Sequence, residues 1–189
     1  MNIQNRLPAT FRSLYRLFLR TSSAAVLHQR QARKNLRERW RPIFDVGAKV
    51  TQELQHKPAD ATHSWIRGRE EWLRTWNIRV DHTLELLYAS SQARGLPHRL
   101  TRNLGFMVAN EKQRLIAKVT RSTKWDPLNP RTVLKAKEFK QIENRTKDEQ
   151  FHENANGALD EVIRMAEATG TLTLGRNNVP VRRWPRSRK

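Results

Sequence analysis

The sequence of 189 residues contains no cysteine, and this absence excludes several kinds of chemistry. Without thiols the chain forms no disulfide, has no thiolate nucleophile and offers no sulfur ligand to zinc or an iron–sulfur cluster. It contains only 7 Gly and 8 Pro, too few for a low-complexity chain. It also lacks any run of about 18 apolar residues, so no membrane-spanning helix is predicted.

Acidic residues are scarce as well, and this scarcity is the strongest compositional signal. Eighteen Asp and Glu stand against 37 Lys and Arg, which gives a formal net charge of +19. Residues 1–41 hold ten Lys or Arg and one acid, and residues 176–189 hold six and none. A chain this basic repels itself unless an acidic partner is near, so nucleic acid, an anionic membrane and an acidic protein are the candidate partners.

Patterns that carry catalysis are missing too. The six histidines show no metal-ligand spacing; the nearest approach is His56 and His63, with a proline-containing loop between them. There is no Gly-rich phosphate loop, no Ser/His/Asp arrangement and no pair of carboxylates placed for acid–base work. We therefore expect a protein that is not an enzyme and has no metal or cofactor of its own.

Two helices are predicted in the first 55 residues. Apolar side chains repeat at helical spacing over residues 8–20, and Pro8 suits the first turn of that helix. Residues 21–23 form a plausible turn before a second, arginine-rich helix over residues 23–41. Pro42 is expected to end or kink the second helix, and residues 43–55 carry a pattern that resumes it.

A third helix is predicted to run from about Thr62, a good N-cap, to about Arg94. Residues 56–62 before it are polar with a proline, so they predict a loop, and residues 95–97 read as a stop signal. Large aromatic side chains dominate burial in a small bundle, because each covers roughly 150–250 Å². The predicted buried face of this helix consists of Trp65, Trp72, Trp76, Val80, Leu84 and Leu87, with Leu73 beside it.

The second half of the chain gives weaker patterns. Residues 98–120 predict a helix that is broken near Gly105, followed by an irregular linker over residues 122–130. Two further helices are predicted over residues 131–152 and 156–169, and the alternation at residues 171–174 indicates a short strand. The predicted fold class is all-α.

One N-terminal motif carries a family resemblance. The segment Ser-Leu-Tyr-Arg-Leu-Phe-Leu-Arg at residues 13–20 resembles the signature of the LYR-motif family, and an Arg-rich second helix follows at residues 32–41. The aromatic that ends this pattern is Trp40, where the family usually has Phe, or Phe44. The resemblance covers residues 8–44 well, and extends to residue 94 only as a third helix of suitable length.

The resemblance implies an antiparallel three-helix bundle over residues 1–94, which leaves a mostly helical extension over residues 95–175 and a basic tail over residues 176–189. It also implies a protein of the mitochondrial matrix that binds acyl carrier protein and docks it on a larger complex, as an assembly factor or subunit. The acyl-phosphopantetheine of the carrier would then enter the apolar middle of the bundle, and the acidic helix of the carrier would face the basic surface.

The residue types fit this expectation, because guanidinium groups recognise carboxylates and phosphate by paired hydrogen bonds. The residues predicted to contact the carrier are Leu14, Tyr15, Arg16, Arg20, Arg33, Arg37 and Trp40. The residues predicted to line the path of the acyl chain are Phe18, Leu36, Phe44, Trp72 and Trp76.

Plainer interpretations stay open beside this one. The apolar stripes are explained by core packing, Tyr15 and Arg16 by a surface pair, and the arginine-rich start by an import signal that is not cleaved. The main alternative function is a mitochondrial ribosome-associated protein that contacts rRNA, and iron–sulfur biogenesis is a third. In the rRNA alternative the nucleic acid is contacted by Arg182, Arg183, Trp184, Arg186, Arg188 and Lys189.

Overall fold

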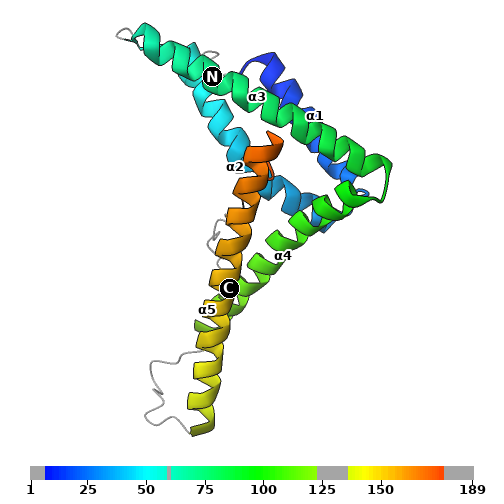
Figure 1. The fold of residues 1–189 in the computed structure, drawn as a ribbon, viewed down its shortest axis with the longest axis vertical. Helices are drawn as coiled ribbons and strands as arrows, with labels where there is room; N and C mark the ends of the chain where they lie inside the picture. Colours follow the sequence, from blue (N-terminus) through cyan, green and yellow to red (C-terminus); the bar gives the residue numbers. More distant parts are fainter. Residues whose placement is uncertain (1–6, 59–60, 123–135, 177–189) are drawn as a thin grey trace, which may run out of the picture. The chain divides into compact units, whose positions relative to one another are not determined.

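The computed structural model describes residues 7–58, 61–122 and 136–176, and these residues are helical apart from short connections. The described residues contain five helices and no strand, which confirms the all-α prediction for this part of the chain (Figure 1). The helices are α1 (Ala9–Ala25), α2 (Arg30–Gln55), α3 (His63–Gln92), α4 (Leu96–Ser122) and α5 (Ala136–Gly170). None of them is apolar over a long enough stretch to cross a bilayer.

The chain divides into two compact units. The first combines residues 1–112 with the C-terminal segment that starts at Thr171, and the second consists of residues 113–170. In the first unit, α1, α2 and α3 contact one another, and α3 lies beside α1 (Figure 1). Residues 95–112 and 171–176 complete this unit, so it contains more than the first three helices.

An aromatic cluster forms the centre of the first unit. The ring of Phe44 on α2 lies 4.7 Å from the ring of Phe18 on α1 and 5.4 Å from the ring of Trp76 on α3, measured between centroids. Phe18 also meets the ring of Trp40 at 5.5 Å in an edge-to-face arrangement. Edge-to-face pairs of this kind add to the free energy gained by burying the rings. The predicted apolar stripes of the first two helices therefore meet as a common core.

Gly47 lets α2 and α3 approach closely at this cluster. A Cβ atom added at Gly47 would lie 2.7 Å from Cζ2 of Trp76, inside van der Waals contact with a buried ring. We expect Gly47→Ala to lower the free energy of unfolding by about 1–3 kcal/mol because the ring must move. Gly68 on α3 is the matched control, since an added Cβ there meets nothing within 4 Å.

Urea denaturation measures both variants. Gly68→Ala should raise the free energy of unfolding by about 0.5–1 kcal/mol, because alanine is the better helix former at an open position. The close-approach explanation is wrong if Gly47→Ala is as stable as Gly68→Ala.

The prediction that α1 ends before residue 21 is wrong. The helix continues to Ala25, since the hydroxyls of Thr21 and Ser22 bond back to carbonyls one turn earlier and face the helix itself. The backbone N–H of His28 bonds to the carbonyl of Ser23 and that of Leu27 bonds to Ala24, each at 2.9 Å. This is a Schellman ending with leucine, at φ 53°, where glycine is usual.

One expected helix break does not occur, and a residue expected to end or kink a helix lies inside one. Pro42 lies inside α2, which runs from Arg30 to Gln55. The helix therefore continues past the proline and does not end there. Its neighbours Trp40 and Phe44 are both buried, and their packing offsets the lost hydrogen bond. The predicted break of α4 at Gly105 is wrong, because this glycine packs against Leu36, whose Cδ2 would lie 3.6 Å from an added Cβ.

The predictions of two charged helices and of a strand in the C-terminal half are also wrong. Residues 136–170 form the single helix α5, in which Gly157 is an exposed interior position that costs only about 1 kcal/mol. Residues 171–174 form neither a helix nor a strand, and Thr171 has a φ of 48°. Their backbone groups bond to side chains of α2 and α3 instead. The predicted linker at residues 122–130 lies outside the described residues, apart from Ser122 at the end of α4.

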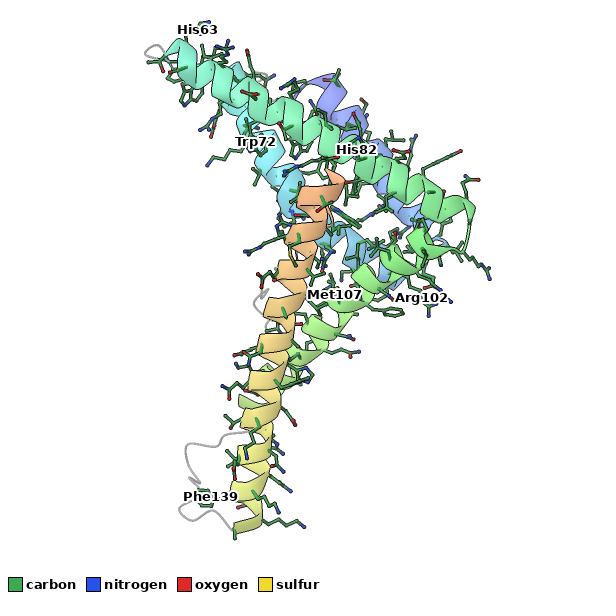
Figure 2. The ribbon with its side chains drawn as sticks, in the orientation of Figure 1. His63, Trp72, His82, Arg102, Met107 and Phe139 are labelled. Atoms are coloured by element: carbon green, nitrogen blue, oxygen red, sulfur yellow. The ribbon has the colours of Figure 1, made fainter. Side chains whose placement is uncertain are left out.

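Helix α3 begins as predicted, and Trp76, Val80 and Leu87 of its predicted face are buried. Thr62 is the N-cap, and its hydroxyl accepts a hydrogen bond from the backbone N–H of Trp65 at 3.4 Å. The prediction that Trp72 belongs to the buried face is wrong, because its side chain is 38% exposed (Figure 2). A row at strict four-residue spacing drifts around the helix by about 40° per step. The buried residues are Trp76, Val80, Thr83, Leu87 and Ser90.

Candidate functional site

A groove of about 660 Å³ opens beside the first turns of α1. Its apolar wall includes Leu14 and Leu17 from α1 and Leu73 from α3, and Thr51 closes it from α2. The complete lining consists of Pro8, Thr10, Phe11, Ser13, Leu14, Leu17, Thr51, Leu73 and Asn77. A site of this size falls within the range of pockets that hold small ligands, about 300–1,000 Å³.

The Leu-Tyr-Arg triplet contributes to three environments around this groove. Leu14 lines it, Tyr15 packs its ring 5.0 Å from that of Phe44, and Arg16 is exposed to solvent. Successive residues of a helix point about 100° apart, so three neighbours necessarily serve three directions. The triplet thus joins an apolar groove, the aromatic core and a charged surface within one turn of α1.

The side chains predicted to line the acyl path lie elsewhere. Phe18, Leu36, Phe44 and Trp76 are buried, and the three rings among them pack on one another in the aromatic cluster. Trp72 is outside the groove lining. Leu14 is the one lining residue that the sequence analysis singled out as functional, although Leu17 stands three positions after it, on the same side of α1.

Arginines on α1 and α2 form the charged part of the site. Arg16, Arg20 and Arg37 are exposed and Arg33 is half-buried. Among the described residues none of these four makes an ion pair. Four guanidinium groups are therefore available to an anionic partner on two neighbouring helices.

Arg39 and Trp40 are buried, unlike Arg33 and Arg37 on the same helix. Each is only 1% exposed, and both donate to the C-terminal segment that starts at Thr171. The Nε of Arg39 donates to the carbonyl of Leu174 at 2.6 Å, and the Nε1 of Trp40 donates to the carbonyl of Thr173 at 2.9 Å. Trp40, predicted to contact the carrier, thus stands between the aromatic core and this segment.

Further contacts fix the C-terminal segment on α3. The hydroxyl of Thr83 donates to the carbonyl of Thr173 and accepts from its N–H, at 3.1 and 2.9 Å. His82 approaches Thr171, with Nδ1 3.0 Å from its carbonyl oxygen (Figure 2). Gly175 has φ +81°, and a Cβ there would lie 2.5 Å from Cγ of Arg39, so only glycine fits.

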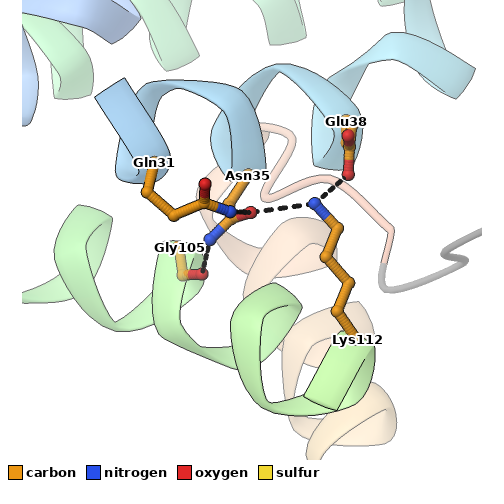
Figure 3. Close-up of polar contacts among 5 residues, drawn as sticks. All are labelled: Gln31, Asn35, Glu38, Gly105 and Lys112. Atoms are coloured by element: carbon orange, nitrogen blue, oxygen red, sulfur yellow. Dashed lines mark hydrogen bonds and ion pairs between the residues drawn. The ribbon is translucent and has the colours of Figure 1, made fainter. Parts of the chain in front are cut away.

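A polar network joins α4 to α2 in the same helix turns (Figure 3). Nζ of Lys112 forms an ion pair with Glu38 and donates to Oδ1 of Asn35 at 2.9 Å. Asn35 in turn donates to the carbonyl of Gly105 at 3.3 Å and accepts from Gln31. Residues 35–40 of α2 therefore contact both α4 and the C-terminal segment of the first unit.

The second unit has its own ion pair and groove. Arg114 on α4 lies 3.9 Å from a carboxylate oxygen of Glu153 on α5. A groove of about 220 Å³ beside them is lined mainly by charged side chains, so it does not suit an acyl chain. The residues predicted to bind nucleic acid, from Arg182 to Lys189, lie outside the described residues.

No protein-family model, curated protein sequence or solved structure matches this chain.

Proposed function

We propose that this chain is a non-enzymatic mitochondrial adaptor that binds an acyl carrier protein through its first unit and docks it on a larger complex. The observation that carries the proposal is the placement of the triplet: Leu14 lines an apolar groove while Arg16 extends into solvent on the same helix turn. An acylated carrier offers the matching pair of features, an apolar chain and an acidic surface.

The charged half of the proposal rests on unpaired guanidinium groups. Arg16 and Arg20 lie one turn apart on α1, and Arg33 and Arg37 lie one turn apart on α2. Like charges at this spacing slightly destabilise a helix when nothing compensates them. Carboxylates and the phosphate of a carrier protein supply that compensation through bidentate hydrogen bonds.

The apolar half rests on the groove. The aromatic rings of Phe18, Phe44 and Trp76 close on one another, so we place the acyl chain in the groove along α1 and α3. Each methylene group buried there contributes about 0.8 kcal/mol. Phe11 belongs to the lining and stacks at 5.5 Å on Trp76, which connects the groove to the core.

A titration with acyl carrier protein tests the groove. We expect the full chain to bind carrier loaded with a long acyl chain more tightly than carrier with bare phosphopantetheine. Leu14→Asn should reduce the ratio of the two affinities about tenfold, since a polar amide replaces an apolar contact. Ile78→Asn is the matched control, because Ile78 is an exposed apolar residue of α3 outside the groove lining. Equal binding of the two carrier forms would remove the acyl part of the proposal.

A second candidate is contact with rRNA. It is favoured by the bond from the N–H of Arg176 to the carbonyl of Arg39 at 3.0 Å, which starts the basic tail directly beside α2. The tail carries Arg182, Arg183, Arg186, Arg188 and Lys189, and Trp184 offers a stacking surface. Titration with RNA in place of the carrier distinguishes the two, since rRNA binding loses affinity steeply as salt rises.

A further inference from the structure

Two chain connections meet at one end of the first unit. The hydroxyl of Ser90, near the end of α3, donates to the carbonyl of Ala25 at the end of α1, at 3.4 Å. After the turn, Ala32 of α2 approaches Gly105 of α4. A Cβ atom added at Gly105 would lie 4.0 Å from the carbonyl oxygen of Ala32. The turn after α1 and the corner between α3 and α4 are therefore neighbours (Figure 1).

Large apolar side chains stand exposed at this end. Leu96 is 78% exposed, Leu27 is 52% exposed and Phe106 is 50% exposed, and Leu100 follows Leu96 by one helix turn. Leu96, Leu100 and Met107 lie on the outer side of α4, while Thr101, Leu104 and Val108 face the core. Leu96 and Leu100 lie one turn apart on α4, near the turn that holds Leu27, and neighbouring exposed apolar side chains of this kind mark interaction sites.

Leu27 is the most informative of these residues. It occupies the left-handed position of the Schellman ending, where glycine is favoured and a leucine is strained. Neither the backbone nor the core requires a leucine there, because half of its side chain is in solvent. A leucine with a strained backbone, at a position where glycine would be unstrained, suggests that its side chain has a function.

The charge in the segment that joins α3 to α4 is of one sign. Residues 86–110 contain three arginines, Arg94, Arg99 and Arg102, and no Asp or Glu. Arg94, Arg99 and Arg102 make no ion pair within the described part of the chain. Arg102 instead lies over the ring of Phe106, with 5.2 Å between its Cζ and the ring centroid (Figure 2).

We propose that this end surface, defined by Leu27, Leu96, Leu100 and Phe106 with Arg94, Arg99 and Arg102, binds the surface of an anionic lipid bilayer. Leucines and a phenylalanine beside arginines are the composition of interfacial segments, in which apolar side chains enter the acyl boundary and cations meet the headgroups. Nucleic acid is the weaker match, since exposed leucines gain nothing from phosphates and do not stack on bases as aromatic rings do.

This surface is independent of the proposed carrier site. It uses neither the groove lined by Leu14 nor the cations Arg16 and Arg37. The protein would therefore hold its carrier while resting on a membrane, which goes beyond the adaptor function and does not depend on it.

A unique label reports insertion directly, because the chain has no cysteine. Leu96→Cys in the full chain, labelled with an environment-sensitive dye, is mixed with vesicles of phosphatidylcholine and phosphatidylglycerol. We expect a blue shift at position 96 that pure phosphatidylcholine vesicles do not produce. Phe139→Cys in the second unit, where Phe139 is 59% exposed, is the control and should not shift. Equal shifts at both positions, or none at position 96, would overturn the proposal.

Uncharged substitutions separate this surface from any attraction by the basic tail. Leu27→Gly should weaken sedimentation with anionic vesicles about fivefold, and Leu96→Ser about tenfold. Leu27→Gly should also unfold at a higher urea concentration, so its lost binding cannot come from lost folding. Leu159→Ser on α5, another exposed leucine, should bind like the unchanged chain. Unchanged vesicle binding by both surface variants would contradict a bilayer site. A chain that binds no vesicles, and whose binding to RNA is lost in the two surface variants, would contradict it as well.

Discussion

Replacing Trp40 by alanine is expected to lower the free energy of unfolding by about 3–5 kcal/mol, the largest stability effect in this chain. The side chain is only 1% exposed and packs edge-to-face on Phe18. Its removal leaves a cavity in the aromatic cluster, because the ring fills the space between α1 and α2. It also removes the donor to the carbonyl of Thr173, which is itself buried.

Two further variants divide this effect into its causes. Trp40→Phe keeps most of the ring volume but loses the hydrogen bond to Thr173, so it should cost about 1–2 kcal/mol. Trp72→Ala removes the same side chain from a site that is 38% exposed, and should cost less than about half of Trp40→Ala. Urea denaturation followed by circular dichroism gives all three values. Similar losses for the two alanine variants would show that Trp40 is not the centre of the core.

Release of the C-terminal segment is a second readout of the same variants. Thr173 and Leu174 are held by Trp40 and Arg39 through bonds that span more than 130 positions of the chain. Amide exchange at Thr173 should become faster in Trp40→Phe, even where global stability changes little. Protection that stays unchanged would mean that Thr83 and Arg39 hold the segment without Trp40.

Helical periodicity allowed much of this core to be predicted from sequence. Phe18 and Trp40 fall on apolar stripes at three- and four-residue spacing, and such stripes pack together when helices are joined by short turns. The same reasoning explains the error at Trp72. A four-residue repeat is slightly longer than one helical turn, so a long row leaves the buried face.

Local breaking signals misled because packing decides the outcome. Pro42 weakens a helix by about 3 kcal/mol or more and Gly105 by about 1 kcal/mol, and the burial of side chains on both sides of each offsets these costs. Gly105 lies against Leu36 of α2. This contact is tertiary, so the residues next to Gly105 in the sequence do not predict it.

Arg39 shows the limit of sequence reasoning for the candidate site. In the sequence it stands among Arg33, Arg37 and Arg41 as one of many cations. Only its angular position differs, because it follows Arg37 by two residues and so points to another side of α2. The carbonyl of Leu174 that it binds lies 135 positions away, and no local pattern announces that partner.

Charge reversal at Arg16 and Arg37 is expected to weaken binding to acyl carrier protein by more than about 100-fold. Each guanidinium contributes charge-assisted hydrogen bonds of about 1.5–3 kcal/mol, and a carboxylate in its place repels the acidic helix of the carrier. Both side chains are exposed and make no ion pair with the described residues, so Arg16→Glu with Arg37→Glu should keep the helicity of the chain.

A matched double variant separates the local effect from the change in net charge. Arg67 and Arg79 are exposed on α3 and also lack an ion pair among the described residues. Arg67→Glu with Arg79→Glu removes the same charge from a chain of +19, and should weaken carrier binding by less than about fivefold at physiological salt. Isothermal titration at two salt concentrations measures both. If the two double variants lose affinity equally, the carrier responds to net charge alone, and the paired arginines of α1 and α2 do not form its binding site.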